Sequence, residues 1–240
     1  MIGIPTSAMI PPLFYFPGKN SGTIQLDENT SKHIVGVLRM KIGEKIQITD
    51  GNGHRFTTEI IDDHKKRCIV KIISDDYVEM ASAKLIIAIS LLKNSNRFEW
   101  FLEKATEIGV RQIIPLVCDR TEKQTFRYER FQQIIVSAML QSQQVYLPLL
   151  ETPVAFAEYV IQSQTGNKYI AHCSVDEPRQ SLFTIPKGAA ATILLGPEGD
   201  FSGNEIQDAK QKGFLPVSLG TNRLRSETAG IVAAVLLKSF

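Results

Sequence analysis

Two glycine-containing stretches near the end of the chain combine residue types that bind small molecules. The first, residues 194–206, reads LLGPEGDFSGNEI, and the second, residues 218–230, reads SLGTNRLRSETAG. Each follows an apolar run typical of a buried strand and precedes a helix-like segment. In open α/β sheets, ligands bind beyond the carboxyl ends of the strands. We therefore expect the two stretches to be loops that line one pocket.

The first loop lacks the features of a phosphate site. It has neither the G-x-G-x-x-G spacing of dinucleotide loops nor a G-x-x-x-x-G-K-[ST] motif. Ser202 and Glu205 have the spacing of a capping box, which satisfies part of the next helix's N-terminus from within. Glu198 and Asp200 would repel a pyrophosphate. A neutral or cationic ligand such as S-adenosylmethionine, with its phosphate-free adenosine and positive sulfonium, fits better; a tight turn that binds nothing is the alternative interpretation.

The composition argues against several other kinds of site. The chain has 240 residues and a net charge of +2, so bulk charge does not define a partner. Its three cysteines form no C-x-x-C pair and its histidines no H-x-x-x-H pattern, so we expect neither a metal site nor a disulfide framework. No apolar stretch reaches the roughly 18 residues of a membrane span. The proline-interrupted start has no basic region, so we expect no signal peptide and a cytoplasmic location.

The first third of the chain has the pattern of a small β-barrel. The sequence DGNG at 50–53 indicates a hairpin, because Gly and Asn tolerate positive φ. The segment NTSKHIVGVLRM reads as a helix, with Asn29 or Thr30 as its cap and with Ile34, Val37 and Leu38 on one face. Four strand-like runs surround it, at 22–26, 44–50, 55–61 and 67–73.

Beyond the polar, linker-like stretch SDDYVEMASA, strands and helices alternate. The run KLIIAISLL is continuously apolar, as expected of a parallel strand covered on both faces. Asn96 and Glu99 have capping-box spacing at the start of the next helix, and a long helix is expected over 127–146. We therefore predict a small β-barrel over 1–75 and an α/β domain with a mainly parallel sheet over 84–240.

Four ordered motifs resemble those of the RsmE family. The two loops are similar to that family's I-G-P-E-G-G-[FL]-[ST]-x-x-E and L-G-x-x-I-L-R-x-E-T-A. Residues 90–110, SLLKNSNRFEWFLEKATEIGV, resemble its A-L-x-K-x-x-[KR]-x-[ED]-x-[IL]-x-x-K-x-[TV]-E-L-G-V. Residues 33–53 resemble its V-L-R-x-x-x-G-[DE] and D-G-x-G signature. The RsmE family consists of SPOUT-superfamily methyltransferases that act on uridine N3 in 16S ribosomal RNA.

The resemblance implies a fold, a cofactor and partners. The barrel would be PUA-like and bind RNA, and the second domain would be a SPOUT fold with a deep trefoil knot. The protein would be a homodimer that binds S-adenosylmethionine beside the subunit interface and methylates 16S rRNA, within the small ribosomal subunit. The implied cofactor-binding residues are Leu195, Gly196, Pro197, Glu198, Gly199, Leu219, Gly220, Leu224 and Arg225.

The chain departs from the family pattern at three places. Asp200 stands where the family has the last Gly of G-P-E-G-G. Gln144 stands where members often have Arg, and FYFPG near the start lacks an Arg that many members carry. These differences leave the cofactor assignment intact and bear on the contacts with RNA.

Methylation of uridine N3 requires loss of the N3 proton. We expect Arg225 to stabilise the negative charge that develops on the uracil carbonyl oxygens; an Arg that merely holds the loop is the alternative. Glu198 or Glu227 could accept the proton, and Glu227 equally suits a first-turn acid that interacts with the helix dipole. No metal is required, because no oxygen nucleophile has to be made from water.

Several side chains could contact RNA. The candidate phosphate contacts are Arg39, Lys93, Arg97, Arg120, Lys123 and Arg223, each of which also suits a plain surface charge. The aromatic residues at 14–16 could stack on bases, although burial in the barrel explains them equally. The target should be flexible or splayed RNA, because the N3 edge is occupied in a Watson–Crick pair.

Two other functions are compatible with these residues. The chain could be a different transferase that uses a nucleotide cofactor, which its affinity for NAD and ATP against S-adenosylmethionine would reveal. It could also be an RNA-binding protein without catalytic activity, in which case no methyl group would be transferred.

Overall fold

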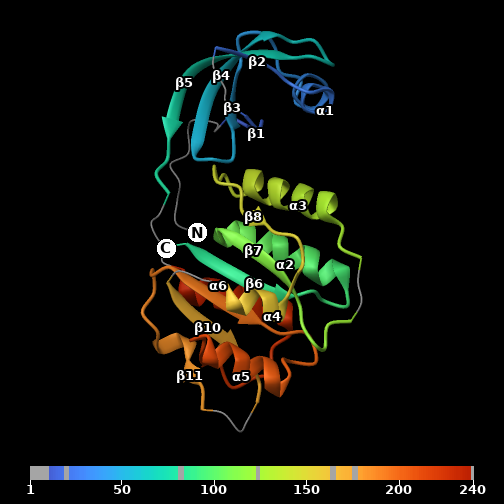
Figure 1. Cartoon of the computed structure of the whole chain (residues 1–240). Coiled ribbons are helices and arrows are strands. Elements are labelled where there is room, and N and C mark those ends of the chain that lie inside the picture. Colours follow the sequence, from blue (N-terminus) through green and yellow to red (C-terminus); the bar gives the residue numbers. More distant parts are fainter. Residues whose placement is uncertain are drawn as a thin grey trace. The chain divides into compact units, whose positions relative to one another are not determined.

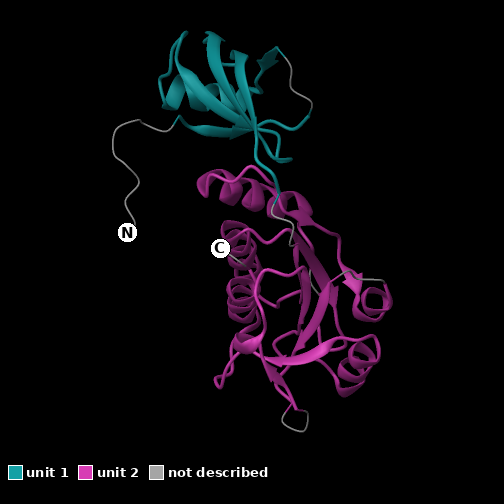
Figure 2. Cartoon of the chain, turned by 90° about the vertical axis from the view of Figure 1, so that its left-hand side faces the viewer, with its two compact units in different colours: residues 1–80 teal, residues 81–240 magenta. Residues whose placement is uncertain are grey.

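The computed structural model describes residues 11–18, 22–80, 84–122, 125–162, 166–174 and 178–238. The chain divides into two compact units, residues 1–80 and residues 81–240 (Figure 2). Each unit has an apolar core of its own.

The first unit is built on a five-stranded sheet with the strand order β1-β3-β4-β5-β2. The hairpin between β3 and β4 forms where the sequence predicted it, with φ angles of 77° at Gly51 and 104° at Gly53. Ile46 and Ile48 of β3 are fully buried, as its alternating pattern requires. The strands are β1 (Leu13–Tyr15), β2 (Thr23–Gln25), β3 (Lys45–Thr49), β4 (His54–Asp62) and β5 (Ile69–Tyr77).

The helical segment of this unit differs in detail from the prediction. Helix α1 (Glu28–Ser31) is capped by Asp27, whose carboxylate accepts hydrogen bonds from the backbone of Asn29 and Thr30, so the predicted caps were wrong. The chain then continues in a wider turn, η1 (Lys32–Val37). Because this turn does not follow the α-helical period, Ile34 is fully buried while Val37 and Leu38 are 70% and 41% exposed, so the three do not share one face as predicted.

The second unit contains a parallel sheet with the strand order β11-β13-β10-β12-β6-β7-β8. All five residues of β12 are buried, because this strand lies between β10 and β6 and is covered on both faces. The strands are β6 (Leu85–Ser90), β7 (Gln112–Val117), β8 (Leu149–Leu150), β9 (Val154–Ala155), β10 (Asn167–Ala171), β11 (Gln180–Ser181), β12 (Ala191–Leu195) and β13 (Leu215–Ser218).

Helices cover both faces of this sheet (Figure 1). One apolar core joins one face to α2 (Ser95–Ile108), α3 (Tyr128–Gln141), α6 (Ser226–Leu237) and the short turn η2 (Leu182–Thr184). A second core joins the opposite face to α4 (Phe156–Ile161) and α5 (Gly203–Gln211). The predicted α/β fold with a mainly parallel sheet is therefore confirmed.

Three element boundaries differ from the prediction. Helix α2 is capped by Asn94, whose Oδ1 accepts a hydrogen bond from Asn96 N at 2.9 Å, rather than by an Asn96–Glu99 capping box. Helix α3 ends at Gln141, before the predicted 146, and Gln143 follows with a left-handed φ of 58°. Strand β5 continues into the predicted linker, because residues as far as Tyr77 pair with β4.

Candidate functional site

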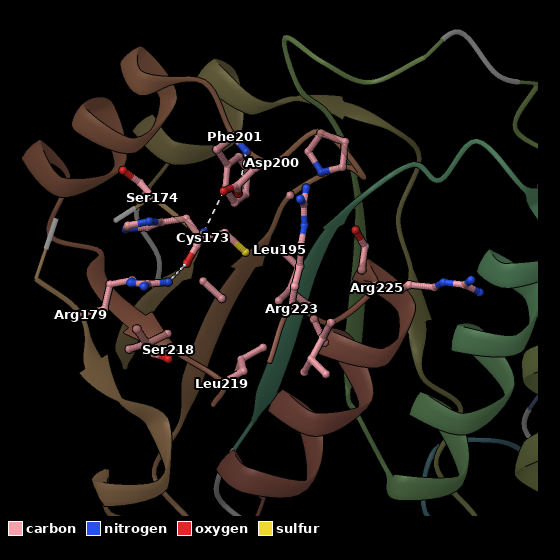
Figure 3. A pocket seen from close by; sticks show the side chains of 18 of the residues that line it. Cys173, Ser174, Arg179, Leu195, Asp200, Phe201, Ser218, Leu219, Arg223 and Arg225 are labelled. Carbon is pink, nitrogen blue, oxygen red and sulfur yellow. Dashed lines mark hydrogen bonds between the residues drawn. The ribbon is translucent and has the colours of Figure 1, made fainter. Parts of the chain in front are cut away.

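Three parallel strands end side by side at the candidate site. Ala171, the last residue of β10, pairs with Leu195 of β12 and with Val217 of β13. The loops that follow leave the same edge of the sheet and enclose a cavity of about 1000 Å³ (Figure 3). A cavity of this size accommodates a ligand as large as a nucleoside derivative. The prediction that the two loops line one pocket is therefore confirmed.

The first loop turns sharply after β12. The backbone N–H of Asp200 donates to Pro197 O at 2.9 Å, which closes a four-residue turn. Asp200 itself has a left-handed φ of 63°. A Cβ on Gly196 would lie 3.1 Å from Phe201 N and 3.2 Å from the Phe201 ring, so glycine permits a close approach of the chain here.

The loop after β7 holds the first loop from outside. Arg120 Nη1 donates to Gly199 O at 2.7 Å. Ser202 and Glu205 form the predicted capping box at the start of α5. Both also bind Asp119, because Ser202 Oγ donates to Asp119 Oδ2 at 2.6 Å and Asp119 N donates to Glu205 Oε1 at 2.9 Å. The position of the turn is thus fixed by a neighbouring strand end.

The second loop joins β13 to α6. Gly220 has a φ of 130°, which side chains rarely adopt, and its N–H donates to Ser218 Oγ at 3.3 Å. Figure 3 shows Arg223 extending from this loop toward the first loop. Arg225 precedes the first turn of α6, and its side chain points away from the cavity toward α2 (Figure 3).

Eight of the nine residues expected to bind the cofactor line this cavity. They are Leu195, Gly196, Pro197, Glu198, Leu219, Gly220, Leu224 and Arg225. The ninth, Gly199, does not line it and instead bonds Arg120 through its carbonyl oxygen.

A further wall of the cavity comes from the segment after β10, which sequence analysis missed. Cys173 N donates to Asp200 Oδ2 at 2.7 Å, and Arg179 Nη1 donates to His172 O at 2.6 Å. All four residues line the cavity. The place of β10 between β12 and β13 could not be predicted, because sequence gives no strand order.

The two candidate bases lie in different surroundings. Glu198 is exposed at the cavity, and its Oε1 accepts a hydrogen bond from Lys93 N at 3.2 Å. Glu227 is 6% exposed in the first turn of α6. Its Oε1 lies 3.7 Å from Arg97 Nε, and its Oε2 has no hydrogen-bond partner among the described residues.

The cations proposed from the sequence are distributed over both units. Arg39 is exposed in the first unit and has a left-handed φ of 58°. The ammonium group of Lys93 pairs with Glu122 at 3.1 Å. Lys123 lies outside the described residues. Arg120 and Arg223 line the cavity, and Arg97 lies beside α6.

The three cysteines differ in burial. Burial raises the pKa of the Cys68 thiol to about 11 and that of Cys118 to about 12, so both stay protonated at neutral pH. Cys173 is an exposed free thiol. In the described part of the chain, no group of three or more ligating side chains could hold a metal ion. The described helices also include none that is long and apolar enough to cross a membrane.

Comparison with known families agrees with this geometry. Residues 79–238 match the family described as RNA methyltransferase domain. The chain belongs to this RNA methyltransferase family. Residues 26–73 match a second description, RNA methyltransferase PUA domain, and lie within the first unit.

Individual members of the RNA methyltransferase family cover nearly the whole chain. The ribosomal RNA small subunit methyltransferase E of Synechocystis sp. is 31% identical over 219 residues, which are 88% of this chain and 71% of the relative. A probable rRNA-methyltransferase from Porphyromonas gingivalis has a TM-score of 0.88 and 34% identity, covering 93% of this chain and 95% of that structure.

A third relative was solved with its methyl donor. The ribosomal RNA small subunit methyltransferase E of Neisseria gonorrhoeae, bound to S-adenosyl methionine, has a TM-score of 0.83 and 28% identity, covering 94% of this chain and 95% of that structure. The resemblance to the RsmE family is therefore confirmed.

Proposed function

We propose that this protein transfers a methyl group from S-adenosylmethionine to N3 of a uridine in 16S ribosomal RNA of the small subunit, in the cytoplasm. The observation that carries the proposal is the cavity at the ends of β10, β12 and β13, which is lined by both family loops. Membership of the RNA methyltransferase family and the relative bound to S-adenosyl methionine support it.

The cavity suits S-adenosylmethionine better than a phosphate-bearing cofactor. The exposed Glu198 puts negative charge on its wall, which favours a sulfonium and disfavours a pyrophosphate, whereas both carboxylate oxygens of Asp200 are already bonded to backbone N–H groups. The N-terminus of α5 is already occupied by the Ser202–Glu205 capping box. We propose that the backbone of both loops holds the adenosine, with Leu195, Leu219 and Leu224 as its apolar contacts, together with the other cofactor residues proposed above.

Bound S-adenosylmethionine supplies the methyl group and leaves as a neutral thioether. For the acceptor, we propose that Arg225 stabilises the charge that develops on the uracil oxygens. Its side chain points out of the cavity toward α2, so the acceptor would approach from that side (Figure 3).

Glu227 and Glu198 are the candidates for the base that takes the N3 proton. The structure favours Glu227, because its buried Oε2 has no protein donor among the described residues and so keeps an acceptor position for an N–H of the substrate. Glu198 already accepts a backbone hydrogen bond from Lys93. We propose Glu227 as the base, held in place by Arg97 at 3.7 Å.

For RNA binding we propose Arg39, Lys93, Arg97, Lys123 and Arg223 as contributors, with Arg39 acting from the PUA-like unit. Arg39 is exposed beside the exposed Val37 and Leu38, so its guanidinium is accessible to a phosphate, which supports this assignment.

We also propose a homodimer and a trefoil knot. Beyond Thr228 every residue of helix α6 is apolar, yet Val235 is 41% exposed and Ile231 and Val232 are only partly buried, which suits a face covered by a second copy. The knot is supported by the resemblance to the RsmE family and by the match of residues 79–238 to the RNA methyltransferase domain.

A methyl-transfer assay tests the proposal. Small-subunit particles lacking the modification should accept tritiated methyl groups, and mass analysis should place them on uridine N3. Calorimetry should show binding of S-adenosylmethionine and none of NAD or ATP. Tight binding of NAD or ATP would favour a different transferase, and binding of RNA without transfer would favour a non-catalytic RNA-binding protein.

Variants of the proposed catalytic residues make the test specific. Arg225→Ala should lower transfer roughly 100-fold while keeping most RNA affinity. Glu227→Gln should lower transfer roughly 100-fold or more at neutral pH, with a deficit that shrinks at high pH where uridine N3 ionises unaided. Glu198→Gln is the matched control. If it shows the larger and pH-dependent loss, Glu198 is the base instead.

A further inference from the structure

Asp200 is an unusual residue for its position. It has a left-handed φ of 63°, and the resembling family pattern has glycine there. A left-handed conformation costs a residue with a side chain about 1 kcal/mol or more relative to glycine. Strained residues of this kind persist when the surroundings compensate them, and they concentrate at functional sites.

The Asp200 carboxylate makes two hydrogen bonds that glycine could not make. Its Oδ2 accepts from Cys173 N at 2.7 Å, and its Oδ1 accepts from Phe201 N at 2.9 Å. The first bond crosses from the loop after β12 to the segment after β10 (Figure 3). Hydrogen bonds to an ionised carboxylate are stronger than neutral ones.

This bond joins two walls of the same cavity. Strands β10 and β12 pair in register up to Ala171 and Leu195, where the sheet ends. Beyond these residues, the described parts of the two segments are not joined by strand pairing. Asp200 and Cys173 both line the cavity, so the bond between them sets the spacing of its walls.

We propose that Asp200 is a positioning residue for the cofactor, because its carboxylate latches the end of β10 to the turn after β12. This inference rests on the proposed function. The latch acts on the shape of the cavity and not on the charge of the ligand. It should therefore favour S-adenosylmethionine and its product S-adenosylhomocysteine equally, since the two differ by one methyl group and one positive charge.

The test compares Asp200→Gly, which removes both bonds and the backbone strain, with Asp200→Asn, which keeps one acceptor oxygen. Asp208→Asn, an exposed acid of α5 outside the cavity, is the control.

Calorimetry should show both ligands bound roughly five- to twentyfold more weakly by Asp200→Gly, with their affinity ratio unchanged. The KM for S-adenosylmethionine should rise while kcat stays within twofold. Asp200→Asn should lie between Asp200→Gly and wild type.

A second readout does not depend on the cofactor. In the ligand-free protein, amide hydrogen exchange at Cys173 should accelerate roughly tenfold or more in Asp200→Gly and stay unchanged in Asp208→Asn. Alkylation of the Cys173 thiol should also accelerate, and Cys68 and Cys118 are buried and provide internal references.

The outcomes separate the two proposals. Unchanged cofactor affinity or unchanged Cys173 exchange in Asp200→Gly overturns the latch. A loss confined to S-adenosylmethionine also overturns it, because the carboxylate would then act through its charge. If wild-type protein binds neither ligand, the proposed function fails, and Cys173 exchange still decides whether the latch exists.

Discussion

At the scale of single residues, Arg120 connects two loops at the candidate site. Its guanidinium donates to Gly199 O at 2.7 Å and to Phe201 O at 3.4 Å. Two carbonyl oxygens of the first loop therefore depend on one side chain from the loop after β7. Sequence analysis proposed Arg120 as a phosphate contact, but its hydrogen bonds are to the backbone of the first loop.

Replacing Arg120 by Lys or Ala distinguishes the two roles. A phosphate contact would survive in Arg120→Lys, which keeps the charge, whereas the clamp depends on Arg120 Nη1, which donates to both carbonyl oxygens and which lysine lacks. We expect both variants to bind S-adenosylmethionine roughly tenfold more weakly, a loss of about 1.4 kcal/mol. Calorimetry measures the cofactor affinity, and filter binding measures the RNA affinity.

Lys93→Ala is the matched comparison for Arg120. It should weaken RNA binding and reduce its salt dependence while leaving cofactor affinity unchanged. If Arg120→Lys keeps full cofactor affinity while Arg120→Ala loses RNA affinity, then Arg120 is a phosphate contact and the clamp is unimportant.

At the scale of elements, the close packing of α6 on α2 positions the second loop. A Cβ on Gly230 would lie 2.5 Å from Cε2 of Phe101, which real contacts essentially never show. Glycine therefore allows α6 to lie directly against the buried ring. Because α6 begins next to Arg225, its position also sets that of the residues proposed to act on uridine.

Gly230→Ala should force the two helices apart. Overpacking of this kind costs about 1–3 kcal/mol of unfolding free energy, which urea denaturation measures. Gly203→Ala in α5 is the control, because a Cβ there meets nothing within 4 Å. Equal stabilities of the two variants would show that Phe101 moves aside without cost.

The elements also show how far sequence reasoning reaches. Apolar runs and helical periods predicted most strands and helices of both units, and the Ser202–Glu205 capping box was predicted from spacing alone. Asp27 and Asn94 were missed as caps, because several polar residues at a helix start compete for that role. The wall after β10 was missed because it depends on strand order, which only long-range pairing determines.

At the scale of the whole molecule, the two family matches fall on different compact units. The PUA match at 26–73 lies within the first unit, and the methyltransferase match at 79–238 covers nearly all of the second. A net charge of only +2 gives little general attraction to RNA. Binding to RNA should therefore depend on local groups such as Arg39 and Lys93, and should respond to single substitutions.

The proposed homodimer provides the last test, because a second copy would cover the exposed stripe of α6. Val235→Asp places a charge on that stripe, where Val235 is 41% exposed, so the monomer should fold while the dimer loses stability. Analytical ultracentrifugation should show a dimer for wild type and a monomer for the variant. Ile161→Asp on α4, 67% exposed and on the opposite sheet face, should remain dimeric. If the acceptor site beside Arg225 needs both copies, the monomeric variant should also lose methyl transfer. A monomeric wild type, or a Val235→Asp variant that stays dimeric, would place the interface elsewhere or exclude it.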